Sequence, residues 1–256
     1  MIDELQLIAS PRGHSESAEV APDPPSFEAD GLSRFSLVPQ QLRERRQWVT
    51  YRLVMPYPFP DDGYIQLLPF KPKKHPFDAK TGAPASELDP ATWSTFQEAS
   101  AALMTDGYDG IGYVFSESDP FIGIDLDYAC DPTLTDALEP GGETHLQAVK
   151  SWAAAIVRRH APKGYVEISQ SKRGLHVICR GRLPGAGGKR LVFDPAGEIV
   201  GQIEMYDRNK FFAVTGQELM GIHQPRVLRG DQMTISATYQ TFGFHGLAPS
   251  NEAIRW

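Results

Sequence analysis

The chain has few cysteines, no long apolar run and no excess of basic residues, and each shortage excludes a class of protein. Two cysteines, Cys130 and Cys179, are too few for a disulfide framework or a four-ligand zinc site, so both are expected to be packing residues. No apolar run approaches the ~20 residues that a membrane-spanning helix needs. The N-terminus lacks the basic and then apolar order of a secretory signal, because Asp3 and Glu4 come first. We therefore expect an intracellular protein without membrane contact.

The net charge of −7 argues at first against a polyanionic partner. The acidic residues are concentrated at one end, however. Residues 1–38 hold seven acids against two arginines, a balance of −5 that leaves only −2 for everything after them. The acidic total therefore does not exclude a nucleic-acid partner for the remainder.

Composition also divides the chain. Hydrophobic residues make up 41% of 256 residues and the mean hydropathy is −0.33, as in an ordinary folded protein of one or two domains. Residues 1–36 are rich in Pro, Ser, Glu, Ala and Asp and predict a disordered acidic tail. We expect the folded domain over 37–220, and 221–256 as an extension of it or a linker.

The most informative stretch is the apolar run Phe121 to Asp127. A strand's side chains alternate between faces, so Asp125 and Asp127 share one face while Ile122, Ile124 and Leu126 share the other. Two stacked carboxylates repel each other unless a positive charge lies between them, and a divalent cation is the usual partner. The alternation therefore predicts a cation site on one face of this strand.

The remaining elements follow from periodicity and turn residues. A short basic helix at 43–46 is expected to lead into a strand at 48–54, with Trp48 in the core. Lys71, Lys73 and Lys74 are expected in an extended basic loop at 71–76, which its prolines keep out of any central ladder. Further strands are expected at 110–115, 165–169, 175–180, 201–206, 211–216 and 233–242, and helices at 89–104 and 144–160.

Two details of this scheme are specific enough to test. The strand at 110–115 is expected to pair with 121–127 as a hairpin across the turn at 116–120. Arg158, Arg159 and His160 end the second long helix, where positive charge is favoured by the helix dipole.

Three motifs stand in a definite order along the chain. They are Ile124-Asp125-Leu126-Asp127, then Ser171 through Gly174 to His176, then Ile203-Glu204. This order and spacing resemble the three signature motifs of the archaeo-eukaryotic primase superfamily, most closely the primase/polymerase (prim-pol) domain of phage and plasmid replication proteins. The stretches 80–82, 89–93 and 110–115 resemble the family's lead-in and 211–216 its exit, so the resemblance covers roughly 40–220.

The resemblance implies a fold and an activity. The fold would be α+β: a primase-polymerase core with an RRM-like, mostly antiparallel sheet flanked by helices, plus a small N-terminal α/β module. The activity would be template-dependent nucleotidyl transfer, as a DNA primase or DNA polymerase in phage or plasmid replication. The partners would be a single-stranded DNA template, NTP or dNTP substrates and a helicase domain or protein, in the cytoplasm of a bacterial or archaeal host.

Residue roles also follow from the resemblance. Asp125, Asp127 and Glu204 would be the catalytic acids and would hold two Mg²⁺ or Mn²⁺ ions, which agrees with the preference of hard cations for carboxylate oxygens. Glu204 stands where many members have Asp, and Asn209-Lys210 where relatives often place Arg. The expected nucleotide-binding residues are His176, Ser171, Lys172, Arg173, Arg208 and Lys210. The expected DNA-binding residues are Arg45, Arg46, Lys71, Lys73 and Lys74.

Two alternatives remain open at this stage. The fold could bind nucleotides or single-stranded DNA without synthesis, as a catalytically silent replication module. It could also be a metal-dependent nuclease. Primer extension on a single-stranded template separates the three, because a binder adds no nucleotides and a nuclease shortens the template.

Overall fold

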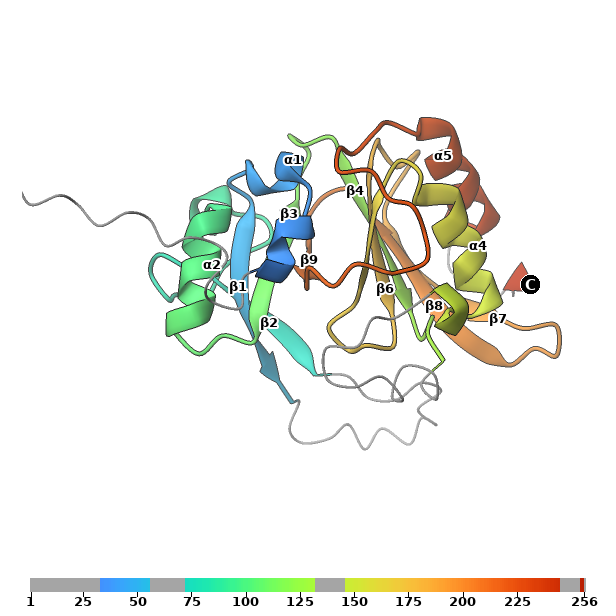
Figure 1. Ribbon diagram of the computed structural model, residues 1–256, viewed down its shortest axis with the longest axis horizontal. Coiled ribbons are helices and arrows are strands. Elements are labelled where there is room, and N and C mark those ends of the chain that lie inside the picture. The colour runs from blue at the N-terminus through green and yellow to red at the C-terminus, as the bar shows by residue number, and fades with distance from the viewer. Residues whose placement is uncertain (1–32, 56–71, 132–145, 245–253, 256) are drawn as a thin grey trace, which may run out of the picture.

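A computed structural model describes residues 33–55, 72–131, 146–244 and 254–255. The strands form two sheets that lie side by side (Figure 1). Sheet A has the order β2-β1-β3-β9 and consists of β1 (Trp48–Val54), β2 (Lys73–Phe77), β3 (Gly110–Phe115) and β9 (Lys210–Val214). Sheet B has the order β10-β7-β8-β4-β6-β5 and consists of β4 (Phe121–Asp127), β5 (Tyr165–Ile168), β6 (Leu175–Arg180), β7 (Gly188–Phe193), β8 (Ile199–Tyr206) and β10 (Ile254–Arg255).

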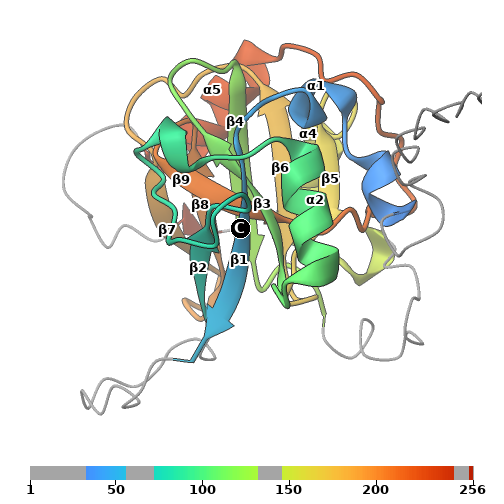
Figure 2. The ribbon, with the colours of Figure 1, turned by 90° about the vertical axis from the view of Figure 1, so that its left-hand side faces the viewer.

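Among the described residues, all strand pairs are antiparallel except β10 with β7, so the predicted α+β class with mostly antiparallel sheets is confirmed. The α-helices are α1 (Gln40–Arg43), α2 (Phe96–Thr105), α4 (Ser151–His160) and α5 (Gln232–Thr241), and the 3-10 helices are η1 (Ser33–Leu37), η2 (Pro90–Thr92) and η3 (Leu146–Ala148). In Figures 1 and 2, α1 and α2 lie beside sheet A, on the side of the molecule away from α4 and α5. No helix among the described residues is long and apolar enough to cross a membrane.

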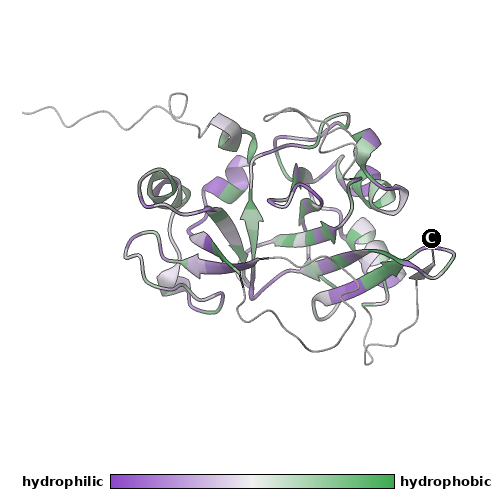
Figure 3. Cartoon of the chain, turned by 90° about the horizontal axis from the view of Figure 1, so that it is seen from below, coloured by the Kyte–Doolittle hydropathy of each residue, from purple (hydrophilic) through white to green (hydrophobic). Residues whose placement is uncertain are grey.

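The central strands β3 and β4 are buried on both faces, and alternate side chains enter different clusters. Ile122, Ile124 and Leu126 of β4 are fully buried in a cluster that sheet B shares with α4 and α5. A second cluster joins α2 and sheet A to the opposite face of sheet B, and includes Phe96, Tyr113 and Phe212. Along the strands and helices in Figure 3, green hydrophobic segments are interspersed with white and purple ones. Both predicted packing cysteines, Cys130 and Cys179, are buried and free, and Trp48 is buried in the second cluster.

The predicted hairpin between 110–115 and 121–127 is wrong, because β3 lies in sheet A and β4 in sheet B. Asp119 in the connecting turn is buried, and its carboxylate accepts hydrogen bonds from the backbone of Ser116 and Phe121 and from Tyr113 and Gln47. These bonds hold the turn so that the chain crosses from one sheet to the other. The connection therefore joins the sheets instead of closing a ladder.

The strand expected at 233–242 is a helix, α5. Asp231 caps it by accepting from the backbone N–H of Thr234, and Ile235, Thr238 and Tyr239 are buried at helical spacing. The lysine-rich loop expected at 71–76 is partly an edge strand, β2, although Pro76 is confined to that edge as expected.

Helix boundaries also differ from the expectations. The predicted helix at 89–104 is split into η2 and α2, because Thr95 and Glu98 form a capping box that starts a new helix. The predicted helix at 144–160 begins at Ser151, and the basic helix at 43–46 ends at Arg43. The start of the folded part also moves, since η1 brings Phe35 of the predicted tail into the core. The rest of that tail, 1–32, lies outside the described residues.

His160 does not serve as a charged helix end. It is buried, and its Nε2 is 2.9 Å from the hydroxyl of Thr238 on α5. Burial lowers the pKa of His160 to about 4, so the ring is neutral at pH 7 and acts as a packing and hydrogen-bonding group.

Candidate active site

Strand register brings three of the predicted site residues, His176, Asp125 and Glu204, into one line across sheet B. Antiparallel partners that lie directly opposite each other point their side chains to the same face. The pairs are Glu167 with His176, His176 with Asp125, Asp125 with Glu204, and Glu204 with Lys189. The transverse row is therefore Glu167, His176, Asp125, Glu204 and Lys189, running over the strands β5, β6, β4, β8 and β7.

The second acid of β4 lies next to this row. Asp127 is two residues beyond Asp125 on the same face, and its partner on β8 is Gln202. The amide of Gln202 donates to Asp127 Oδ2 at 3.3 Å and to Glu204 Oε1 at 2.8 Å. The structure thus brings the three predicted acids together on one face and places an amide donor between two of them.

The three carboxylates lie close enough together to affect one another's ionisation. Burial raises the pKa of Glu204, and the neighbouring carboxylates Asp125 and Asp127 raise it further, while Lys210 and Lys189 act in the opposite direction. Three carboxylates on one face with too little positive charge nearby are a typical environment for a cation or for proton exchange.

His176 is fixed on both sides. Its ring is only 2% exposed, with Nδ1 3.1 Å from Glu167 Oε1 and Nε2 3.8 Å from Asp125 Oδ1. The ring of Phe212 packs against it at a centroid distance of 5.4 Å. The imidazole therefore presents its Nε2 edge to the acids.

A cavity of about 590 Å³ opens over these residues. One wall is the face of sheet B with Asp125, Asp127, His176 and Glu204, and the hairpin residue Ser171 borders it. The opposite wall comes from both edge strands of sheet A, which shows that this sheet curls around the cavity. Its titratable side chains are Lys73, Lys74, His75, Lys210 and one acid, Glu87, which accepts from the backbone N–H of Phe211. Its apolar side chains include Phe211 and Phe212. A mostly basic wall thus faces the acids across a space large enough for a nucleotide-sized ligand.

Not every predicted nucleotide-binding residue borders this cavity. Lys172 and Arg173 are exposed in the β5–β6 hairpin loop and are absent from the lining. Arg208 pairs with Asp207 and with Glu117, so its guanidinium is engaged outside the cavity. Lys210 does border the cavity, with its Nζ 5.4 Å from the centre of the Tyr206 ring.

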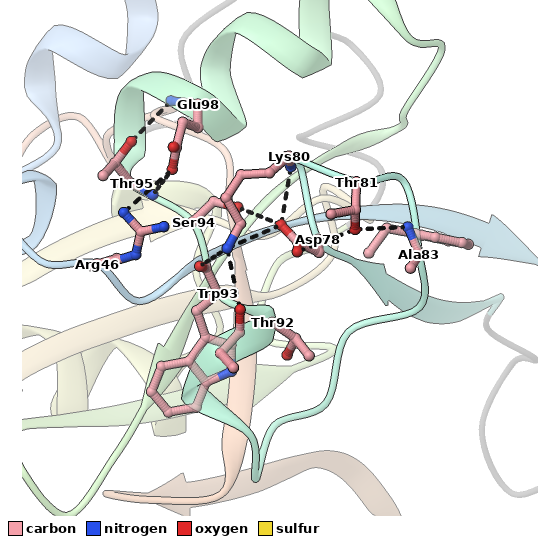
Figure 4. A network of polar contacts seen from close by, with 12 residues as sticks. Arg46, Asp78, Lys80, Thr81, Ala83, Thr92, Trp93, Ser94, Thr95 and Glu98 are labelled. Atoms are coloured by element: carbon pink, nitrogen blue, oxygen red, sulfur yellow. Dashed lines mark hydrogen bonds and ion pairs between the residues drawn. The ribbon is translucent and has the colours of Figure 1, made fainter.

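The predicted DNA-binding residues also separate. Lys73 and Lys74 line the cavity, whereas Lys71 lies outside the described residues. Arg45 stacks over the Phe121 ring, and Arg46 is 4.0 Å from Glu98 (Figure 4). Both arginines lie next to α1 and border a different hollow from the acids.

The lead-in stretch serves as a support for the fold. Figure 4 shows Lys80 reaching the carbonyl of Trp93, while buried Asp78 accepts from Ser94 and from Thr81. Lys80 also donates to the carbonyl of Ala91. These bonds connect the turn after β2 to the segment before α2, and none of these residues lines the cavity.

The three acids have the donor atoms that a divalent metal ion prefers, but not the spatial arrangement of a metal site. Their carboxylate oxygens are hard donors gathered on one face, which suits Mg²⁺ or Mn²⁺. As the side chains lie, no group of three His, Cys, Asp or Glu residues within the described ranges has the arrangement of a metal centre. The Gln202 amide bridges Asp127 and Glu204 in this arrangement. The carboxylate oxygens therefore suit Mg²⁺ or Mn²⁺, and binding of the ion would require the side chains of Asp127, Gln202 and Glu204 to rearrange.

The predicted site left out four residues of this region. Gln202 is expected on the strand face of Glu204 by simple alternation, but it was given no role. Glu167 is a single acid within the apolar strand β5, which could have indicated a buried partner. His75 belongs to the expected basic loop at 71–76, whereas Glu87 carries no comparable signal and is brought to the cavity only by the fold.

Comparison with known proteins adds one relationship. No protein-family model matches the chain. A curated protein, the DNA primase-polymerase of Nitratiruptor phage NrS-1, is 32% identical over 148 residues. The match takes in 58% of this chain and 18% of that protein, so the chain spans less than a fifth of its relative's length. The match supports the presence of a primase-polymerase domain, in agreement with the motifs.

Proposed function

We propose, from the premise that the chain carries a primase-polymerase domain, that it is a nucleotidyltransferase that extends or initiates a strand on a single-stranded DNA template. The observation that carries this proposal is the register of sheet B. It places all three motif acids and His176 on one face of a cavity whose other wall carries three lysines and one acid. The name of the phage relative supports the same activity.

Asp125, Asp127 and Glu204 would hold two divalent ions, Mg²⁺ or Mn²⁺. When bound, such ions neutralise charge on the attacking and leaving oxygens of an in-line displacement. Three carboxylates on one face match that requirement better than they match a pure binding surface, which has no need for clustered negative charge.

The basic residues of the cavity would bind the triphosphate. Lys73, Lys74 and Lys210 provide charge opposite the acids, and His176 presents Nε2 beside Asp125. Ser171 borders the cavity from the β5–β6 hairpin and can donate from its hydroxyl. These groups would align the triphosphate with the acids, and such positioning accounts for most of the catalysis in phosphoryl transfer.

Phe211 and Phe212 are the phenylalanines of the cavity lining. Apolar walls exclude water from the reacting groups and strengthen the electrostatic interactions around them. A base or sugar of the incoming nucleotide would pack against these rings, since aromatic faces accept any base.

The deciding experiment is primer extension. The chain is incubated with single-stranded DNA, Mn²⁺ or Mg²⁺ and labelled ribo- or deoxynucleotides, with and without a primer. We expect metal-dependent products in the wild type and none in the double variant Asp125→Ala/Asp127→Ala. Glu198→Ala is the matched control, because Glu198 is an exposed acid in the β7–β8 hairpin and lies outside the cavity lining.

Each other outcome points to a different function. Undiminished synthesis by the double variant would refute the assignment of the acids. A template that is retarded on a gel but never extended would indicate a binding module, and a shortened template would indicate a nuclease.

A further inference from the structure

Glu167 is a buried carboxylate that the proposed chemistry does not use. It lies in the middle of β5 with no exposed surface, and it is not part of the cavity lining. A charged group in such a place is costly unless several donors compensate for its lost hydration. The hydrogen-bond donors around Glu167 therefore indicate its role.

Four donors converge on its two oxygens. The hydroxyl of Tyr165 donates to Oε2 at 2.9 Å, and the backbone N–H groups of Thr215 and Gly216 lie within 3.1 Å of the carboxylate. The fourth contact is Nδ1 of His176, 3.1 Å from Oε1. Because a carboxylate only accepts, this set fixes its orientation and requires Nδ1 of His176 to carry a proton, while Nε2 is free to carry a second one and donate.

Three of these contacts come from rigid groups. Two are backbone amides that follow directly after β9, and Tyr165 is fully buried beside Glu167 on the same strand. The carboxylate is therefore held independently of His176, and the imidazole is oriented against a fixed acceptor. Its opposite edge, Nε2, is then directed to Asp125, and Phe212 limits rotation of the ring.

We propose that Glu167 is the positioning residue for His176, holding the imidazole so that Nε2 meets the triphosphate of the incoming nucleotide. This inference rests on the proposed function. Glu167 touches no substrate itself, and its effect passes through the ring of His176.

Glu167→Gln is the informative variant, because it keeps the shape of the side chain. Thr215 and Gly216 N–H groups select the amide oxygen at the position of Oε2, which turns the NH₂ group toward His176 Nδ1. A donor then faces a donor, and the ring loses its fixed orientation. Tyr165→Phe is the matched control, since it removes one donor to Oε2 and leaves the contact with His176 intact.

The first readout is the KM and kcat of primer extension. We expect Glu167→Gln to raise the nucleotide KM about tenfold, the loss of one charge-assisted hydrogen bond, with a much smaller change in kcat. Tyr165→Phe should change KM less than about twofold on the same reasoning.

The second readout is a double-mutant cycle with His176→Asn. If Glu167 acts through His176, adding Glu167→Gln to His176→Asn leaves KM unchanged. If the two effects multiply instead, Glu167 has only a structural role and the inference is overturned. An unchanged KM in the single variant Glu167→Gln overturns it as well.

Binding separates this inference from the proposed function. The affinity of the wild type, Glu167→Gln, His176→Asn and the double variant for a fluorescent nucleoside triphosphate is measured without a template. A wild type that binds but never extends would refute synthesis and leave the cycle measurable in Kd. Should Glu167→Gln fail to fold, ¹⁵N spectra of the wild-type histidine side chains decide instead: protonation of His176 at Nε2 alone would overturn the inference.

Discussion

Replacing Glu204 by Gln should make the metal-free protein more stable while it abolishes synthesis. Glu204 lies directly opposite Asp125, and side chains in such pairs have Cβ atoms about 5 Å apart. Two unit charges at that distance repel by about 3 kcal/mol at an effective dielectric constant of about 20. Lys189 and Lys210 offset part of this repulsion. We therefore expect a net gain of about 1 kcal/mol, or a rise in Tm of about 2–4 °C for a domain of this size.

The same repulsion predicts the direction in which the stability of the metal-free protein changes with pH. The folded-state pKa of Glu204 is raised above its ordinary value by burial and by Asp125. The folded protein then holds a proton that the unfolded chain has already released, so its contribution to stability falls as the pH rises from about 4.5 through the raised pKa. Glu204→Gln should remove this decline.

The assay is thermal unfolding in EDTA and in Mn²⁺ between pH 4 and 8. In Mn²⁺ the wild type should gain stability by ligand binding and the variant should gain less. Glu198→Gln is the control, because it changes the net charge equally on an exposed hairpin position. A lower Tm for Glu204→Gln in EDTA, or an equal gain in Mn²⁺, would refute the view that these carboxylates repel each other and share a cation.

Three further predictions address other residues. Gln202→Ala should lower the free energy of unfolding in EDTA by about 2 kcal/mol, because its amide bridges two carboxylates, and an unchanged urea midpoint would contradict this. The double variant Lys73→Ala/Lys74→Ala should raise the nucleotide KM in primer extension about tenfold or more, whereas Arg173→Ala should not. The reverse result would indicate that the β5–β6 hairpin loop binds the triphosphate instead. His160, whose pKa is lowered to about 4 by burial, should make stability rise by about 3 kcal/mol between pH 4 and 6.5, and His160→Asn should flatten that slope in urea unfolding at each pH.

The sequence predicted the acids of sheet B well because period-two alternation is a local property. It placed Asp125 and Asp127 opposite a buried apolar face, and the strand β4 has that arrangement. The order of the three motifs then predicted which distant residues join them, and the register brings His176 and Glu204 beside Asp125.

Features that depend on long-range packing were not predictable in this way. The crossing from β3 to β4 depends on the buried carboxylate of Asp119, whose donors include the distant Gln47. The curl of sheet A, which brings Lys73 and Lys74 to the acids, has no local signature. Lys172 and Arg173 matched the second motif, yet both are exposed and neither lines the cavity.

The transverse row limits where residues can be inserted into or deleted from sheet B. Its members are spread over five strands, and each is aligned only by the pairing of its strand with the next. Inserting one residue into any of these strands would exchange the two faces, moving an apolar side chain into the row and a charge into the core. Length changes are therefore expected only in the connecting loops. A measurement of activity in this protein would therefore also report whether the strands of sheet B have paired in the correct register.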